Sequence, residues 1–235
     1  MISVVIPAYN EEKNIKRCLE AFETQQTTQQ FEVILVDNNS TDRTYDIAKT
    51  FLKKIPLVIL REPTKGRGNA RAAGFRIAKG EIILSTDADA IVPPDWIEKM
   101  AKAFTDSSVA AVTGTGKMID AGRVKNTLAT YTLPFAMHVY ALFHRHYWLS
   151  GFNFGIRKEI YEKSGGFRQI NGLEDIDLGF RVYPLGKIRY KPIWVYMSGR
   201  RFHKSVMAGF VSYLKGYIDY RIKRKQEIYL SDVRD

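Results

Sequence analysis

Short apolar runs alternate with amphipathic segments along the first half of the chain. Each apolar run ends at polar or turn-forming residues, a pattern typical of strands buried on both faces of a parallel sheet. The segments between the runs repeat apolar residues three or four positions apart, as Ile15, Leu19 and Phe22 do, which indicates helices. The pattern predicts strands near residues 2–6, 31–36, 57–60, 82–84 and 109–112, and helices near 11–26, 43–53, 69–79 and 94–104.

This alternation of strand and helix predicts the fold class. Repeated strand–helix–strand units build a mainly parallel sheet flanked by helices, so we expect a Rossmann-like α/β fold. Right-handed crossovers place the loops that follow the strands at one edge of such a sheet. Polar residues that lie far apart in the sequence, from Tyr9 to Asp89, can therefore meet at this edge.

The second half of the chain has a less regular pattern. We expect an amphipathic aromatic-rich segment at 120–147, a strand or tight crossing at 151–156, one or two short strands within 188–197, a short helix near 158–164, and a helix that opens within 171–177 and ends near 183. The residues after Gly199 have a helical pattern. The prediction is one domain over residues 1–200, divided into halves at 1–115 and 116–200, followed by a basic amphipathic helical tail at 201–235.

The composition limits the class of protein and its partners. With 235 residues, of which 45% are hydrophobic, the chain can build a full core. Its one cysteine, Cys18, rules out an internal disulfide framework and a cysteine-based zinc site, and it fits a reducing compartment. The net charge of +11 suggests an anionic partner, either a nucleotide, a membrane surface or nucleic acid. Because no recognition motif accompanies the charge, nucleic acid is not expected.

Two carboxylates, Asp87 and Asp89, follow the apolar run at 82–84. Open α/β sheets bind their ligands beyond the carboxyl ends of the strands. Aspartate oxygens at such a position suit Mg²⁺ or Mn²⁺ that carries a diphosphate. The alternative is that Asp87-Ala88-Asp89 begins a turn and caps the helix that opens at 94–96.

Five motifs of the chain occur together in the order and spacing of a known family. They are VVIPAYNEE, VDNNSTD, GRGNARAAG, STDAD and NGLEDID, and they fall within roughly residues 1–200. In this respect the chain resembles the inverting family-2 glycosyltransferases of the GT-A fold. The resemblance implies a nucleotide-sugar-binding half at 1–115 and an acceptor half at 116–200. It also implies transfer, with Mg²⁺ or Mn²⁺, of a sugar from a UDP- or GDP-linked donor to a hydroxyl of a glycan or lipid-linked acceptor.

The resemblance further implies roles for single residues. Asp89 would bind the metal directly, and Asp87 would contact the ribose or a metal-bound water. Asp175, beside Glu174, would be the general base that deprotonates the acceptor hydroxyl. The alternative for Glu174, Asp175 and Asp177 is stabilisation of a helix N-terminus, worth roughly 0.3–1 kcal/mol per charge. The implied nucleotide-sugar contacts are Pro7, Tyr9, Glu11, Asp37, Asn38, Lys65, Arg71, Asp87, Arg200 and Arg201, and the implied additional metal contact is His203.

Asn38 departs from the usual family pattern, which has a second acidic residue at this position. An amide both donates and accepts hydrogen bonds, so Asn38 can still contact a base edge, but the choice between uridine and guanosine stays open. Lys65 and Arg71 flank a loop in which Gly66 and Gly68 allow close backbone approach to an anion. The alternative for these basic residues is a solvated loop, and the alternative for Tyr9 is packing at a strand end.

Membrane association is a further expectation. Between residues 200 and 225 basic and aromatic residues interleave, so the tail can lie on an anionic membrane surface or pack on the domain. The apolar segment at 128–149 can shield a lipid-linked acceptor, although we find no transmembrane helix in the sequence. The expected location is cytoplasmic, peripheral on the inner face of the cell membrane. The alternative functions are a polyprenyl-phosphate sugar synthase and a catalytically silent binding module recruited to membranes.

Overall fold

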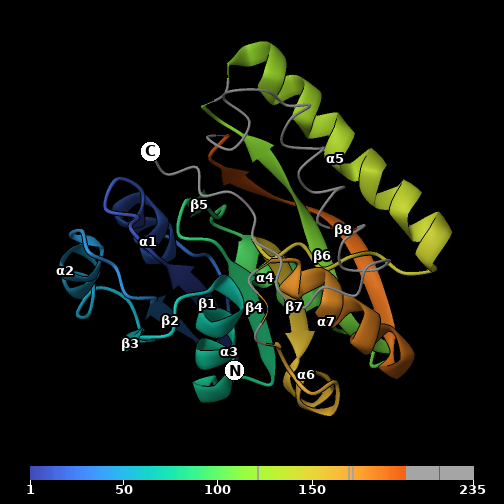
Figure 1. Cartoon of the computed structure of the whole chain (residues 1–235), viewed down its shortest axis with the longest axis horizontal. Helices are drawn as coiled ribbons and strands as arrows, with labels where there is room; N and C mark the ends of the chain where they lie inside the picture. The colour runs from blue at the N-terminus through green and yellow to red at the C-terminus, as the bar shows by residue number, and fades with distance from the viewer. Residues whose placement is uncertain (121, 169, 171, 200–216, 218–235) are drawn as a thin grey trace.

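A computed structural model describes residues 1–199 except 121, 169 and 171, and in addition Tyr217. One eight-stranded sheet runs through this part of the chain in the order β3-β2-β1-β4-β7-β6-β8-β5, with helices on both faces (Figure 1). The expected α/β class with a flanked central sheet is therefore confirmed. The sheet joins strands from both halves of the chain. Strand β7 (Asn153–Arg157), from the second half, lies between β4 (Ile82–Thr86) and β6 (Val109–Met118).

The elements from β1 to β4 form the parallel part of the sheet. They are β1 (Ile2–Ala8), α1 (Ile15–Glu23), β2 (Phe31–Asp37), α2 (Thr44–Lys49), β3 (Leu57–Arg61), α3 (Arg67–Ile77) and β4 (Ile82–Thr86). The pairs β1–β2, β1–β4 and β2–β3 are all parallel. Their carboxyl ends consequently lie at one edge, as the strand–helix alternation predicted.

The elements that follow β4 complete the sheet in a mixed arrangement. They are β5 (Ala90–Ile91), α4 (Trp96–Lys102), β6 (Val109–Met118), α5 (Arg123–His144), β7 (Asn153–Arg157), α6 (Lys158–Lys163), α7 (Glu174–Val182), a 3₁₀ turn (Tyr183–Leu185) and β8 (Lys187–Met197). β7 runs antiparallel to both β4 and β6, and β8 runs parallel to β6. The short strand β5, which the sequence pattern did not predict, pairs with the end of β8.

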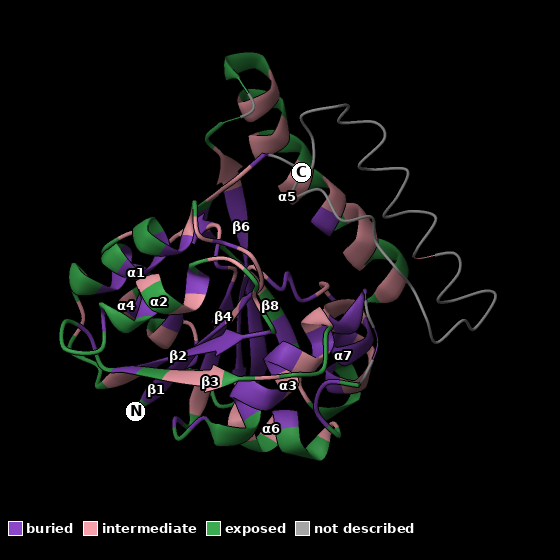
Figure 2. Cartoon of the chain, turned by 60° about the vertical axis from the view of Figure 1, so that its left-hand side comes forward, coloured by how far each residue is buried: buried purple, intermediate pink, exposed green. Residues whose placement is uncertain are grey.

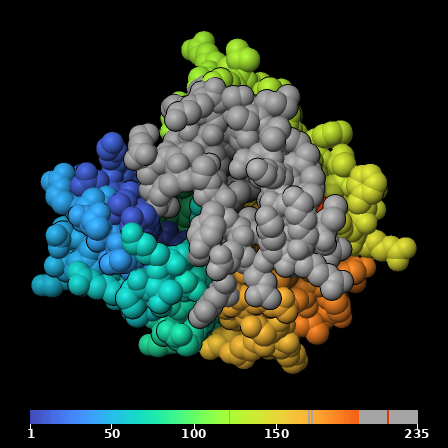
Figure 3. Space-filling model, in the orientation of Figure 1, coloured from blue at the N-terminus to red at the C-terminus, as the bar shows by residue number. Residues whose placement is uncertain are grey.

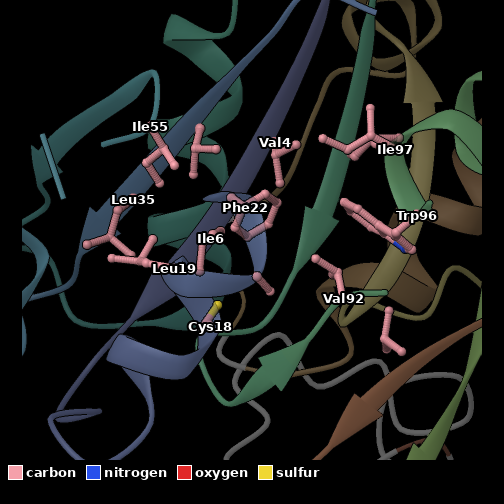
Figure 4. Packing of buried hydrophobic residues seen from close by; sticks show 14 of the residues in the cluster. Val4, Ile6, Cys18, Leu19, Phe22, Leu35, Ile55, Val92, Trp96 and Ile97 are labelled. Atoms are coloured by element: carbon pink, nitrogen blue, oxygen red, sulfur yellow. The ribbon is translucent and has the colours of Figure 1, made fainter. Parts of the chain in front are cut away.

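Alternate residues of the central strands feed two hydrophobic clusters, one on each face of the sheet. Val4 and Ile6 of β1 pack with α1, α2 and α4, whereas Val5 packs on the other face with α3, α6 and α7. Figure 4 shows the first cluster, with Cys18 and Phe22 of α1 beside β1. Cys18 is buried in this cluster as a free thiol. This two-sided burial explains why the strands read as continuous apolar runs.

Helix α3 lies unusually close to the sheet because of Gly74. A Cβ atom at this position would overlap Val5 and would come within 2.9 Å of Val36. The close approach fixes α3 against β1 and β2 and thereby sets the position of Arg71, which lies one turn earlier on the same helix. Gly74 thus connects the packing of the sheet to the polar residues at its edge.

Helix α5 extends along the outside of the molecule, and Figure 2 shows it clear of the layers that cover the sheet. The helix expected within the aromatic-rich segment is confirmed. Within α5, which is described over its full length, only Met137 is buried. In the described part of the chain, no helix combines the length and the hydropathy that crossing a bilayer requires.

Candidate active site

The loop after β4 carries Asp87 and Asp89. The backbone N–H of Ala90 donates to the carbonyl oxygen of Asp87 at 3.0 Å, which closes a tight turn between β4 and β5. The residue that precedes α4 is Asp95, and β5 separates this helix from the two aspartates. The alternative that Asp87 and Asp89 serve as the cap of α4 is therefore wrong.

Three carboxylates surround the buried thiol of Cys18. Burial raises the pKa of this thiol well above its ordinary value, and the negative charges of Asp89, Asp87 and Glu11 raise it further. The thiol also contacts the carbonyl oxygen of Asp87 at 3.6 Å. The end of β4 and the start of α1 therefore bring three carboxylates together in one negative region, which can attract a cation.

Arg71 of α3 connects this loop to the start of α7. Its guanidinium donates through Nη2 to Asp87 at 2.6 Å and through Nη1 to Glu174, a residue 103 positions further along the chain. Arg71 is 1% exposed and Glu174 is 2% exposed, so their ion pair is buried. The arginine places the two acidic motifs, Asp87-Ala88-Asp89 and Glu174-Asp175, side by side.

This position differs from the one that the family resemblance implied for Arg71. We expected a nucleotide contact, but both terminal nitrogens of the buried guanidinium bind carboxylates of the chain itself. The backbone of Gly151 packs against the same group, and a Cβ at Gly151 would lie 2.6 Å from Nη2. Arg71 therefore holds the two acidic residues in position, and its contact with a nucleotide stays a prediction.

Asp175 lies in the first turn of α7 and is partly exposed. Its carboxylate accepts hydrogen bonds from the backbone N–H of Gly151 and of Ile176, both at 2.9 Å. The carbonyl oxygen of Gly151 in turn accepts from the hydroxyl of Ser85 on β4, also at 2.9 Å. Through Gly151, β4 and α7 together fix the orientation of Asp175.

The pKa of Asp175 is raised to about 6. The main cause is burial of its carboxylate, and the negative charge of Glu174 raises the pKa further, whereas Arg71 and the two backbone N–H groups lower it. A carboxylate with a pKa near neutrality can both accept a proton in the reaction and be ionised at physiological pH. Asp175 therefore has the properties of a general base.

Asp177, the third acid in this turn, has a different environment. It is buried and bonded to Arg181 at 2.5 and 2.9 Å and to Arg168 at 3.3 Å. Arg181 lies on α7 itself and Arg168 in the segment before it, so Asp177 stabilises the helix and the neighbouring loop. Asp177 therefore has a structural role, through ion pairs with arginines.

Asp37 and Asn38, at the end of β2, also have distinct roles. Asp37 is buried, and its Oδ1 has no hydrogen-bond partner among the described residues. Asn38 donates through Nδ2 to the carbonyl oxygens of Glu62 and Thr64, at 2.9 and 2.7 Å, and accepts at Oδ1 from the N–H of Gly66 at 2.8 Å. Both amide hydrogens of Asn38 are thus used to hold the loop before α3, which leaves none to donate to a base.

Tyr9 and Lys65 approach one another across the same edge of the sheet. The ammonium of Lys65 donates to the hydroxyl of Tyr9 at 3.2 Å and lies 5.1 Å from the centre of its ring. Pro7 lies two residues earlier in β1. Glu11 is buried, and its carboxylate accepts from the side chain of Asn14 at 2.9 Å, so it supports the start of α1.

The oxygen atoms at the end of β4 fit a Mg²⁺ or Mn²⁺ ion that arrives with a diphosphate. Among the residues that the structure describes, no group of three or more His, Cys, Asp or Glu side chains has the arrangement of a metal site. A protein site for Mg²⁺ commonly supplies only one or two carboxylates, and phosphate oxygens and water complete the shell. Asp87 and Asp89 meet that requirement within the negative region described above.

The sequence model of glycosyl transferase family 2 matches residues 3–165. The chain belongs to this family. The matched segment includes β1 to β4 and the loop of Asp87 and Asp89, and it ends before α7.

Curated relatives of this family-2 chain carry glycosyltransferase names. A probable glycosyltransferase, YdaM, of Bacillus subtilis (strain 168) is 34% identical over 209 residues, which cover 81% of this chain and 49% of YdaM. A dolichol-phosphate mannosyltransferase of Pyrococcus furiosus is 32% identical over 126 residues, or 53% of this chain and 35% of that protein. The chain thus spans about half or less of the length of these relatives.

Solved structures of glycosyltransferases share the fold. The mannosyltransferase PcManGT from Pyrobaculum calidifontis, in complex with GDP-Man and Mn²⁺, superposes with a TM-score of 0.74 at 22% identity, covering 94% of this chain and 64% of PcManGT. TarS 1-349 of S. aureus, in complex with UDP-GlcNAc, gives 0.66 at 21% identity, covering 84% and 58%. The family-2 chain therefore has the GT-A architecture that its motifs indicated.

Some expected contacts of this family-2 chain lie outside the described residues, namely Arg200, Arg201, His203 and the tail at 201–235 apart from Tyr217. Tyr217 contacts the end of α5, with its hydroxyl 2.9 Å from Nε2 of His144. Sequence reasoning missed Ser85 and Gly151, which orient Asp175. Ser85 belongs to the STDAD motif, but nothing in the sequence around Gly151 reveals its contact with Arg71.

Proposed function

We propose that this family-2 glycosyltransferase is a metal-dependent inverting enzyme that moves a sugar from a UDP- or GDP-linked donor to a hydroxyl. The observation that carries this proposal is the bridge from Asp87 through Arg71 to Glu174. The bridge joins the loop that carries Asp89, the proposed metal ligand, to the turn that carries Asp175, the proposed acceptor of the proton. Both functions are needed in one place when a sugar is transferred directly.

Asp175 would act as the base. Its carboxylate takes the proton of the acceptor hydroxyl as that oxygen attacks the anomeric carbon from the side opposite the nucleoside diphosphate. The new glycosidic bond forms as the bond to the diphosphate breaks, so one displacement inverts the anomeric configuration, whereas retention by a double displacement needs a covalent intermediate. The residues Gly151 and Arg71 hold Asp175 and Glu174 in place during this step.

On the donor side, Asp89 would hold the metal directly and Asp87 would contact the ribose or a metal-bound water. A bound Mg²⁺ or Mn²⁺ supplies Lewis-acid stabilisation of the departing diphosphate. Tyr9 and Pro7 would form a wall for the base, Asp37 would accept from the nucleoside, and Lys65 would approach the phosphates. The unpartnered buried oxygen of Asp37 supports this assignment, because such an atom is costly unless a ligand donates to it. PcManGT in complex with GDP-Man and Mn²⁺ and TarS with UDP-GlcNAc support a nucleotide-sugar donor.

The acceptor would be a glycan or lipid-linked hydroxyl, with 1–115 as the donor half and 116–200 as the acceptor half of the domain. We place the enzyme in the cytoplasm, peripheral on the inner face of the cell membrane. The single buried cysteine supports a reducing compartment. The dolichol-phosphate mannosyltransferase among the relatives supports a lipid-linked acceptor and favours, as second candidate, a polyprenyl-phosphate sugar synthase.

A panel of UDP- and GDP-sugars with Mn²⁺ tests the proposal. Slow hydrolysis of one donor is expected in the wild-type chain, and NMR of the transferred sugar with a hydroxyl acceptor should show inversion. The variant Asp175→Asn should keep binding of the nucleoside diphosphate, measured by calorimetry, and lose at least about 100-fold in transfer. Retained transfer to a phosphate acceptor by this variant would favour the synthase. Binding without turnover of any donor would show a silent module and overturn the proposal.

A further inference from the structure

One face of α5 carries large apolar side chains that point away from the rest of the described structure. These side chains follow at intervals of three, four or seven residues, which places them in one narrow sector of the helix. They are 52% to 81% exposed. The stripe consists of Val124, Leu128, Tyr131, Phe135 and Leu142. Met137, the buried residue of α5, lies on the opposite side.

Such a stripe is unusual on the surface of a water-soluble domain. A helix that covers a core turns its apolar face inward, whereas α5 turns most of its large apolar side chains outward. In the space-filling view, the residues of α5 form the outer rim at the top and right of the molecule (Figure 3). Contiguous exposed apolar surface of this kind marks a binding surface for another protein or a membrane.

The charges around the stripe favour an anionic membrane as its occupant. The sequence contains no Asp or Glu between Asp120 and Glu159, while Arg123 and Lys125 lie at the start of α5 and Arg145 at its end. Cations and aromatic rings beside an apolar helix face suit the headgroup region of an anionic bilayer. A second copy of this chain fits less well, because two such helices would bring positive charges together in a protein of net charge +11.

We propose that α5 docks this protein on an anionic membrane surface. The apolar stripe enters the interface between headgroups and acyl chains, and Arg123 and Arg145 contact the headgroups. This docking rests on the proposed function and deepens it. Gly151, whose N–H binds the base Asp175, lies only six positions after Arg145. A docked α5 keeps the acceptor half at the lipid surface, where a lipid-linked acceptor lies.

Co-sedimentation of the full chain with vesicles tests the docking. The wild type should bind vesicles of phosphatidylcholine mixed with phosphatidylglycerol, and bind phosphatidylcholine alone much more weakly. The double variant Phe135→Ser/Leu142→Ser should lose at least about tenfold in binding, equal to ~1.4 kcal/mol. The matched control Leu52→Ser/Leu185→Ser removes two exposed leucines from other surfaces and should change binding less than about twofold.

The charge contribution has its own pair of variants. Arg123→Gln/Arg145→Gln should reduce the preference for phosphatidylglycerol, whereas the exposed control pair Lys13→Gln/Lys53→Gln should reduce it less. If the first stripe variant unfolds by circular dichroism, Val124→Ser/Leu128→Ser repeats the test at the other end of α5. This arrangement separates loss of docking from loss of fold.

Two results would overturn the docking proposal. One is equal vesicle binding by the folded stripe variants and the wild type. The other is a dimer in light scattering that the stripe variants abolish, together with no vesicle binding, which would make α5 a contact between copies. Donor hydrolysis in solution without vesicles should be the same in the stripe variants and the wild type. A failure of membrane docking can therefore be distinguished from a failure of the enzymatic function.

Discussion

Replacing Arg71 by methionine removes the cation that joins the two acidic motifs. Methionine keeps an unbranched side-chain stem but leaves the buried carboxylate of Glu174 without its counter-charge. Breaking a buried ion pair by removing one partner typically costs about 3–5 kcal/mol. Because a domain is stable by only about 5–15 kcal/mol, we expect a large fall in the urea midpoint of Arg71→Met.

The same substitution should change catalysis in a specific direction. The positive charge of Arg71 lowers the pKa of Asp175, so its removal should raise that pKa above the present value of about 6. A base works when deprotonated, and the acidic limb of the pH–rate profile should accordingly shift to higher pH. Misplacement of Asp87 and Asp175 by about 1 Å should also reduce kcat by about 100-fold.

A double variant separates the effect of the unpaired charge of Glu174 from the effect of the lost support of Asp87. In Arg71→Met/Glu174→Gln the unpaired buried charge is gone, so much of the lost stability should return, whereas kcat should stay low because Asp87 is still unsupported. The matched control is Lys99→Met, which removes an exposed ion pair with Asp95 and should change stability by about 0.5 kcal/mol or less. A loss below about 1 kcal/mol in Arg71→Met, with an unchanged pH profile, would refute the positioning role.

Three further outcomes are expected. The wild-type rate should fall as the pH drops through about 6, because protonated Asp175 cannot accept the acceptor's proton; a flat profile from pH 5 to pH 8, with chemistry shown to be rate-limiting, would contradict this. Gly151→Ala should displace the guanidinium of Arg71 and cost about 1–3 kcal/mol in a urea titration, together with most activity; wild-type stability would show that the site can absorb a methyl group. Asn38→Ala should release the loop at 62–66 and weaken calorimetric binding of the donor nucleotide, with a stability loss of about 1–3 kcal/mol; unchanged binding would separate that loop from the donor site.

Local pattern was sufficient to predict most elements of the fold. The strands β1 to β4 are continuous apolar runs because both faces of the sheet are covered, and this burial leaves a direct trace in the sequence. The antiparallel direction of β7 has no such trace, since it depends on how the chain returns after α5 and not on the residues of β7. The two-residue strand β5 exists only because the end of β8 lies beside it.

In the candidate site, too, some features follow from the local sequence pattern and others depend on distant segments. The positions of Asp87, Asp89 and Asp175 follow from motif and topology, because each comes directly after a strand end or at a helix start. The role of Arg71 does not follow from the sequence. A basic residue near a glycine-bearing loop gives the same sequence pattern whether it binds a phosphate or two buried carboxylates. The contacts of Asn38 likewise depend on the path of a distant loop. Side-chain hydrogen bonds between distant segments are the part that sequence patterns leave open.

The reach of Arg71 across the fold has a practical consequence for dissecting this protein. The segment that the family model matches ends at residue 165. A shortened protein could be designed to end at the same residue. Such a truncation would delete Glu174 and leave the buried guanidinium of Arg71 with Asp87 as its one remaining acidic partner. The smallest version that folds and works must therefore retain α7, so the boundary set by sequence similarity falls short of the boundary set by electrostatics.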